Sequence, residues 1–189
     1  MSPDEKECPF CAEIIKEKAK KCKHCGSVLE EQISQITHPK VEPQKDKEQL
    51  ENIFKLAETA SESGNHEEAY IYYTKILEVN PDNYKAWFGK SVSAGWQSTL
   101  ANLRILETVK GIQIAIEKAP DAEKDNLKIL AGASLKSLVV AIDKLAFDSF
   151  INYITSENHN EYISRMQLLV SILEIASNYN PEDKDTLEY

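Results

Sequence analysis

The sequence predicts a mainly α-helical protein, in which a body of helical hairpins follows a small module built on a β-hairpin. Three observations lead to this prediction. All four cysteines lie within the first thirty residues, as two C-x-x-C pairs. From Leu50 onward, apolar residues recur three and four positions apart, which is the spacing of one face of an α-helix. Three helical stretches stop at prolines, namely Pro81, Pro120 and Pro181, because proline cannot continue the backbone hydrogen bonds of a helix.

The composition of the chain changes twice along its length. Residues 1–30 hold the cysteines, residues 31–48 hold two prolines and alternating charges and are expected to be a flexible linker, and residues 49–189 form the helical body. The sequence holds 31 acidic and 22 basic residues, and the excess of acidic charge lies after residue 30. An acidic body repels phosphate backbones, so we do not expect nucleic acid to be the principal ligand.

The sequence shows no apolar leader after Met1 and no apolar stretch long enough to cross a membrane. The most apolar run, Leu135 to Phe150, is interrupted by charged residues, as expected for a helix buried in a soluble protein. We therefore expect a cytoplasmic protein that has no membrane partner.

The two cysteine pairs predict a structural zinc site. Cys8 and Cys11 form one knuckle, and Cys22 and Cys25 form the other, so that four thiolates can converge on one ion. Four thiolates are the ligand set of a tetrahedral structural zinc, and they leave no position for a catalytic water. We expect one Zn²⁺ per chain, with His24 as a neighbour of the ion and not a ligand. A disulfide pairing does not fit a chain without an export signal, and a redox pair needs a βαβ setting that is absent.

The segment between the two pairs, residues 13–22, is too short for a packed helix but long enough for a β-hairpin. Ile15, Ala19 and Leu29 are the only candidates for its core, so binding of the metal must supply most of the folding free energy. Gly26, which follows the second pair, suits a reversal of the chain that needs a positive φ angle.

The residues around the cysteines carry a family resemblance. The pattern C-P-x-C-A-E-x-I-K, followed by A-x-x-C-K-x-C-G, is similar to that of a small bacterial zinc-ribbon family of unknown function. The chain departs from this pattern because isoleucine stands at both Ile14 and Ile15. The resemblance covers only the first thirty residues, and it implies a ribbon fold and bound zinc without implying an activity.

Lysines at positions 16, 18, 20, 21 and 23 give the ribbon a basic edge. This edge leaves a nucleic-acid-associated protein as an alternative reading of the function. Nearby glutamates balance the lysines, and the ribbon has no arginine to read a base, so we favour an ordinary solvated surface.

Residues 50–83 predict a hairpin of two helices. Leu50 to Ser63 and Gly64 to Asn83 each place apolar residues on one face, and the second stretch stops at Asn80-Pro81. Two helices in about 34 residues is the period of the tetratricopeptide repeat. The sequence resembles that family at four positions of the second helix: Gly64, Ala69, Tyr73 and Pro81. It departs from the family in the first helix, at Ile53, Ala57 and Ala60.

Two further hairpins, lengthened and degenerate, are expected after Pro81. Asp82 and Asn83 are good residues for the start of a helix, which carries Trp87 at the position of the family's packing tryptophan. Later helices are expected from about Thr99 to Lys118, from Asp121 to about Ile154, and from Glu161 to Asn180, with a break at 156–160.

The resemblance to tetratricopeptide repeats implies a groove that binds another protein or a peptide. In that family, the first helix of each hairpin lines the groove on the face away from the packing tryptophan. The residues expected on that face are Phe54, Phe88, Val92 and Trp96. An exposed apolar surface of this kind usually marks an interface; the alternative is that a long C-terminal helix fills the groove.

No catalytic motif accompanies these features. The sequence has no glycine-rich phosphate loop, no G-x-S-x-G and no H-E-x-x-H, and its histidines are scattered through turns and the linker. We therefore expect a non-enzymatic adaptor, which holds a structural zinc and binds another protein through its helical body. An enzyme with an unrecognised site in the body is the second alternative.

Overall fold

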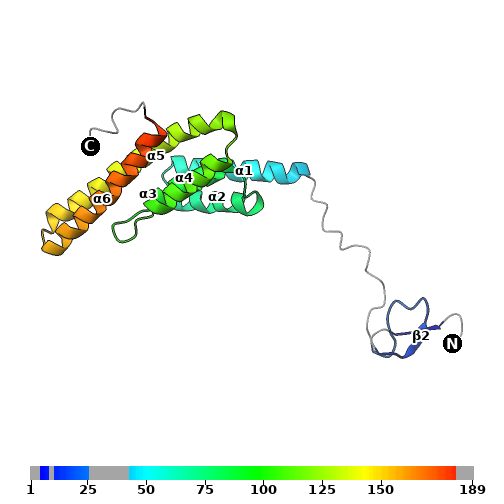
Figure 1. The fold of residues 1–189 in the computed structure, drawn as a ribbon. Helices are drawn as coiled ribbons and strands as arrows, with labels where there is room; N and C mark the ends of the chain where they lie inside the picture. The colour runs from blue at the N-terminus through cyan, green and yellow to red at the C-terminus, as the bar shows by residue number, and fades with distance from the viewer. Residues whose placement is uncertain (1–4, 9–10, 26–42, 182–189) are drawn as a thin grey trace. The chain divides into compact units, whose positions relative to one another are not determined.

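A computed structural model describes residues 5–8, 11–25 and 43–181 (Figure 1). The chain divides into two compact units, Met1–Asp46 and Lys47–Tyr189. Among the described residues, a two-stranded sheet lies near the N-terminus and six helices follow it. The structure therefore confirms a mainly α-helical fold with a small antiparallel sheet at the N-terminal end.

The sheet is formed by two strands of three residues each. β1 (Glu5–Glu7) pairs antiparallel with β2 (Ile14–Lys16), and Lys6 lies opposite Ile15. Within β2 only the central residue, Ile15, is buried, because side chains of a strand alternate between its two faces. The sheet therefore contributes one apolar side chain to the core of the ribbon.

The loop of this hairpin is the first cysteine knuckle, which contains Cys8 and Cys11. The expectation of a hairpin within residues 13–22 is wrong, because the knuckle itself reverses the chain. The N–H of Ala12 donates to the carbonyl of Cys8 (2.8 Å), and the N–H of Cys8 donates to the carbonyl of Glu13 (2.9 Å). These bonds bring the flanking residues together as strands on either side of the knuckle.

The first helix, α1, spans Pro43–Glu62. It begins inside the segment 31–48, for which the sequence predicts a flexible linker, so residues 43–48 are helical. Proline suits the first turn of a helix, where its missing N–H is not needed. The rest of that segment, residues 31–42, lies outside the described residues.

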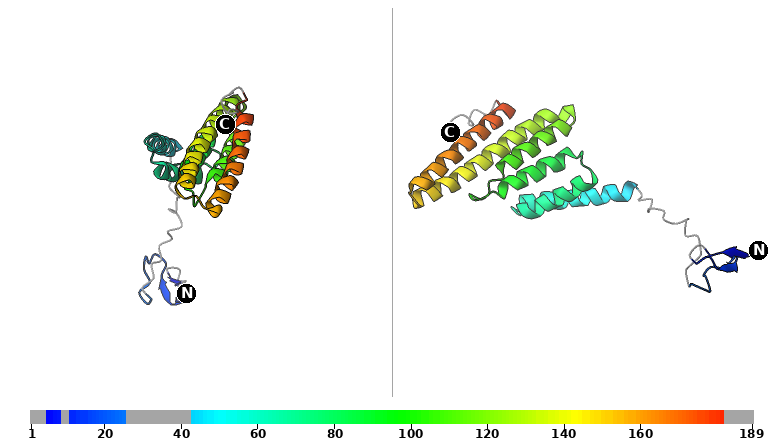
Figure 2. Two further views of the ribbon diagram at one scale, coloured as in Figure 1. Left: turned by 90° about the vertical axis from the view of Figure 1, so that its left-hand side faces the viewer. Right: turned by 60° about the horizontal axis from the view of Figure 1, so that its bottom comes forward.

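Five helices follow α1, and three of them end where the sequence predicts. The helices are α2 (His66–Val79), α3 (Tyr84–Trp96), α4 (Ile105–Lys118), α5 (Asp121–Asn152) and α6 (Ser156–Tyr179). Helices α2, α4 and α6 each end two residues before a proline. Neighbours in sequence pack side by side, α2 on α3, α3 on α4 and α5 on α6, as Figures 1 and 2 show.

Side-chain caps determine where several helices begin. Asn65, Asn83 and Thr155 each accept a hydrogen bond from the backbone N–H three residues later, which starts α2, α3 and α6. Because Thr155 caps α6, residues 156–160 are its first turns, and the prediction of a break there is wrong. Helix α4 starts at Ile105, later than predicted, because residues 99–102 form a closed turn.

Two hydrophobic clusters hold the helices together. The first joins α1, α2 and α3 through Ala57, Ile76 and Ala86, and the second joins α4, α5 and α6 through Ile112, Leu135 and Ile172. Helix α3 serves both clusters, since Trp87 packs against the first and Phe88 against the second. Helix α3 therefore lies between the two clusters, and five of its residues line a pocket of the body.

The contact between α3 and α4 depends on a glycine. A β-carbon at Gly111 would lie 1.9 Å from the Oγ of Ser91 on α3, far inside van der Waals contact. The two helices therefore approach each other at a point where one of them has no side chain. None of the described helices has the combination of length and apolar character needed to cross a membrane.

Candidate functional site

The four cysteines converge on one point in the ribbon. Their sulfurs all lie within 4.8 Å of one another, and no disulfide links them. The sulfurs of Cys8 and Cys25 are 3.8 Å apart, and those of Cys11 and Cys22 are 3.7 Å apart. A tetrahedral ion with metal–sulfur bonds of about 2.3 Å requires sulfur–sulfur distances of about 3.8 Å. The cysteine geometry therefore fits a metal ion, as the sequence predicts.

The fold of the ribbon buries two of the four ligands. Cys8 and Cys22 are each 2 % exposed, and they pack with Ile15, which is 3 % exposed. Ala19 packs partly against the same cluster, whereas Leu29, the third predicted core residue, lies outside the described residues. Such a small apolar cluster cannot by itself offset the conformational entropy of the chain.

Backbone groups of the second knuckle favour the thiolate of Cys22. Its Sγ accepts hydrogen bonds from the N–H groups of His24 (3.4 Å) and Cys25 (3.5 Å). The bond from Cys25, followed by that from His24, lowers the pKa of Cys22. The side chain of His24 is exposed and does not belong to the ligand cluster.

The thiol of Cys11 behaves in the opposite way. A backbone hydrogen bond with Glu13 favours its thiolate, but burial and hydrogen bonding with the other thiols outweigh this effect and raise the pKa of Cys11 to about 12. Four negative sulfurs this close together repel one another strongly. A cation bound between them removes this repulsion, which is the chemical reason that the cluster suits a divalent metal.

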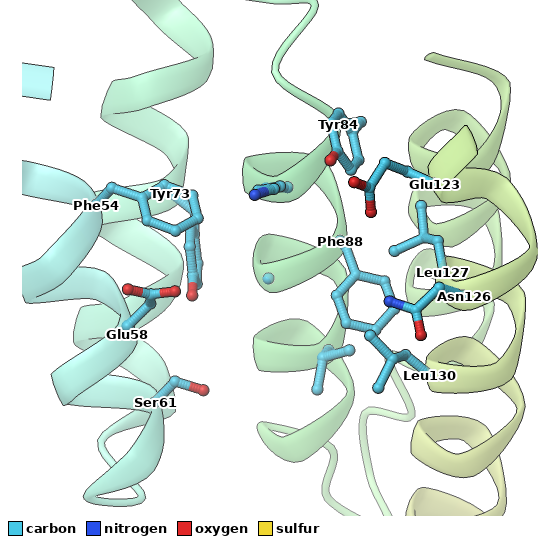
Figure 3. Close-up of a pocket in the computed structure, with 13 residues that line it drawn as sticks. Phe54, Glu58, Ser61, Tyr73, Tyr84, Phe88, Glu123, Asn126, Leu127 and Leu130 are labelled. Atoms are coloured by element: carbon cyan, nitrogen blue, oxygen red, sulfur yellow. The ribbon is translucent and has the colours of Figure 1, made fainter. Parts of the chain in front are cut away.

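The helical body contains a pocket of about 410 Å³ (Figure 3). The residues that line it come from α1, α2, α3 and α5: Phe54, Glu58, Ser61, Tyr73, Tyr84, Lys85, Phe88, Gly89, Val92, Glu123, Asn126, Leu127 and Leu130. Three of the four residues predicted for partner binding, Phe54, Phe88 and Val92, are therefore brought together. The fourth, Trp96, does not line the pocket.

Trp96 instead covers the beginning of α2. Its indole stacks on the ring of His66, with ring centres 5.6 Å apart and an interplanar angle of 15°. Trp96 is 41 % exposed, so it is neither a core residue nor part of the groove floor. The predicted packing tryptophan, Trp87, is partly buried, and its indole N–H donates to the carbonyl of Pro81 at 2.9 Å.

The floor of the pocket depends on a close contact between Tyr73 and Gly89. A β-carbon at Gly89 would lie 2.3 Å from the Tyr73 ring, so only glycine lets the ring lie against α3. Phe54 meets Tyr73 edge to face, with ring centres 5.7 Å apart. Tyr73 is 5 % exposed, yet its hydroxyl has no hydrogen-bond partner within the described part of the chain.

Helix α5 forms a wall of the pocket and does not fill it. Leu127 is buried in a cluster with Ala115 and Ala119, against which Phe88 packs. Leu130, one turn further on, is 47 % exposed and lines the opening. The alternative that a long helix after Pro120 fills the groove therefore does not describe α5, which leaves the pocket open.

Several residues that line the pocket were not predicted from the sequence, although they recur at helical spacing. Glu58 and Ser61 follow Phe54 by four and seven residues on α1. On α5, Glu123, Asn126, Leu127 and Leu130 show the same spacing of three, four and seven. If polar residues had been counted in the helical periodicity, this spacing would have grouped the lining residues of α1 on one face and those of α5 on another.

The ribbon carries a second hollow, of about 390 Å³. Ile14, Ile15 and Ala19 form its apolar part, and lysines 16, 18, 21 and 23 surround them. Four of the five lysines of the predicted basic edge therefore line this hollow, and Lys20 does not.

Comparison with protein-family models, curated proteins and solved structures found no match to this chain. The resemblances to a zinc ribbon and to tetratricopeptide repeats thus rest on the motifs described above.

Proposed function

We propose that this protein is a non-enzymatic adaptor, in which a ribbon holds one structural zinc ion and a helical body binds a segment of another protein in the groove between α1 and α5. The observation that carries the proposal is the pocket itself. It is mainly apolar, it is lined by residues from four helices, and three of its residues are those that the repeat resemblance places in a ligand groove.

The donor set of the ribbon supports zinc as the metal. Sulfur ligands select soft or borderline ions, and four of them at tetrahedral distances form a closed site. A closed site has no position for a water or a substrate, so the ion supplies folding free energy and not catalysis. Thiols without disulfides agree with a reducing compartment, and we propose a cytoplasmic location.

Site-specific photo-crosslinking of the full-length, zinc-loaded protein tests the groove. A photoreactive amino acid at Leu130, which is exposed at the opening of the pocket, is expected to capture the partner in cells. The same amino acid at Val79 is the matched control, because Val79 is 65 % exposed on α2 and does not line the pocket. Equal capture at both positions would contradict a partner site in the groove.

Nucleic-acid binding by the ribbon is the second candidate function, and the four lysines around the second hollow favour it. Each lysine that contacts a phosphate releases counterions, so such binding weakens steeply as salt rises. Titration of the full chain with single- and double-stranded nucleic acid at two salt concentrations separates this function from the adaptor. Binding that Lys16→Ala and Lys21→Ala weaken at low salt would support it.

A further inference from the structure

Two exposed carboxylates line the pocket from different helices. Glu58 extends from α1 and Glu123 from α5, and Figure 3 shows both on the sides of their helices that face α3. Neither makes an ion pair or a hydrogen bond within the described part of the chain. The pocket therefore carries carboxylate oxygens on two of its walls. Within the described part of the chain, no cationic group forms an ion pair with them.

The hydroxyl of Tyr73 lies beside the first of these carboxylates. The Tyr73 ring is almost fully buried, and Figure 3 shows its hydroxyl beside Glu58, in the space between α1 and α3. Burial, and then the charges of Glu58 and Glu62, raise the pKa of Tyr73 to about 12. The hydroxyl lines the pocket and has no hydrogen-bond partner within the described part of the chain, so it is free to accept a hydrogen bond from a bound group.

The remaining lining is mostly apolar, with one cation at its edge. Phe88, Leu127 and Leu130 offer a surface on which a long aliphatic side chain can pack. Lys85 also lines the pocket, but its side chain is exposed and its Nζ lies 5.9 Å from the centre of the Tyr84 ring. The pocket thus combines an apolar slot with two carboxylates and a single ammonium group.

From these groups we infer that the pocket receives a lysine or arginine side chain from the partner's segment, an inference that rests on the proposed function of the groove. The aliphatic stem packs against the apolar wall, and the cationic head donates to the Glu58 carboxylate and to the Tyr73 hydroxyl oxygen. An acidic segment would bring like charges together. A neutral apolar side chain would remove water from these polar groups without replacing its hydrogen bonds.

The test measures binding of the full-length, zinc-loaded protein to four peptide libraries that differ only in a fixed central residue. That residue is lysine, arginine, norleucine or glutamate, and the flanking positions are degenerate. Norleucine keeps the apolar stem and lacks the charge. We expect the lysine and arginine libraries to bind about tenfold more tightly than the norleucine library, and the glutamate library to bind most weakly.

The variant E58Q/E123Q is expected to lose this preference while keeping its thermal stability. Its matched control is E67Q/E78Q, which removes two exposed carboxylates of α2 that do not line the pocket and is expected to keep the preference. An equal loss of this preference in both variants would show that it follows only the net charge of the protein, and it would overturn the inference.

A groove-blocking variant, Val92→Trp, separates failure of the inference from failure of the function. If norleucine peptides bind as tightly as lysine peptides and Val92→Trp abolishes both, the inference is wrong and the groove still binds a partner. If no library binds, or if Val92→Trp has no effect on binding, both the inference and the proposed function of the groove are wrong.

Discussion

The backbone of Ala12 has a φ angle of 58°, which is a left-handed conformation. Among the described residues other than glycine, Ala12 alone has a positive φ angle. That conformation costs a residue with a β-carbon roughly 1–2 kcal/mol. Ala12 follows the first cysteine pair as Gly26 follows the second, and Gly26 lies outside the described residues. The first knuckle therefore holds strain that glycine would remove.

Ala12→Gly is expected to raise the metal affinity of the ribbon by a few-fold. Removal of the strain outweighs the roughly 0.5–1 kcal/mol of conformational entropy that glycine adds to the unfolded chain. Competition with a chromophoric chelator measures the affinity. Ala19→Gly, at a residue without a positive φ angle, serves as the control and should weaken binding. A weaker affinity for Ala12→Gly would show that the knuckle is not strained there.

The ring of His66 predicts a pH dependence of stability. Burial lowers its pKa, and its Nδ1 is buried without a hydrogen-bond partner. The folded state therefore binds fewer protons than the unfolded state, whose histidines titrate near pH 6.5. The stability that comes from the neutral ring is present above about pH 6.5 and is lost as the pH falls toward the lower, folded-state pKa.

The helical melting temperature at pH 7.5 and pH 5.5 measures this effect. We expect a decrease of a few degrees in the unmodified protein and a smaller decrease in His66→Phe, which keeps the stacking on Trp96. His159→Phe, at an exposed ring, is the control and should retain the full decrease. An identical decrease in all three proteins would assign the pH dependence to other groups.

At the scale of the elements, Gly111 on α4 allows α3 and α4 to pack closely. Gly111→Ala is expected to destabilise the body by about 1–3 kcal/mol, although alanine favours a helix by roughly 1 kcal/mol over glycine. The added carbon would meet Ser91 Oγ, so Ser91→Ala should restore part of the loss in the double variant. Urea unfolding of the three variants measures this. Stabilisation by Gly111→Ala would mean that the helices separate freely.

Helix ends were easier to predict than helix starts. The prolines at 81, 120 and 181 end the helices at the two or three residues before them, so the helix ends can be predicted from the local sequence. The start of α6 depends on Thr155, whose capping bond competes with turn-forming residues such as Asn158 and Asn160 that suggest a break. The hairpin of the ribbon was misplaced because the knuckle acts both as metal-binding loop and as strand connection.

Three of the four residues predicted for the groove line the pocket, and the angular drift of a helix explains why Trp96 does not. Successive residues turn by about 100°, so each step of four advances by about 40° around the axis. Val92 is one such step from Phe88 and still lines the pocket. Trp96 is two steps away, about 80° round, and contacts His66 instead. Wall residues on α5 could not be paired with α1 from sequence, because their contact depends on the tertiary fold.

At the scale of the whole molecule, the ribbon and the body have separate cores. The ribbon's cluster contains Cys8, Ile15 and Cys22, whereas the clusters of the body begin at Leu50. The sequence could predict this division, because cysteine spacing and helical periodicity occupy different parts of the chain. If the proposed metal supplies most of the free energy that orders the ribbon, the two units should respond differently to a chelator.

Removal of zinc is expected to unfold the ribbon and to leave the melting of the helical body unchanged. Protein purified without chelator should contain one zinc per chain, and Cys22→Ser should contain much less. Metal analysis gives the ratio, and helical melting curves with and without chelator give the stability of the body. A large decrease in the melting temperature of the body after zinc removal would contradict two independent cores.

Helix α5 is 32 residues long, which corresponds to about 48 Å. Its first three turns carry Glu123 and Leu130 beside the groove, while Phe147, near the other end, is 47 % exposed and lies against Tyr162 of α6, with ring centres 6.3 Å apart. A helix is stiff along its axis, so a tilt of α5 beside the groove would displace its far end by a larger distance than its near end. Spectroscopic labels at the far end would therefore report such a tilt most sensitively.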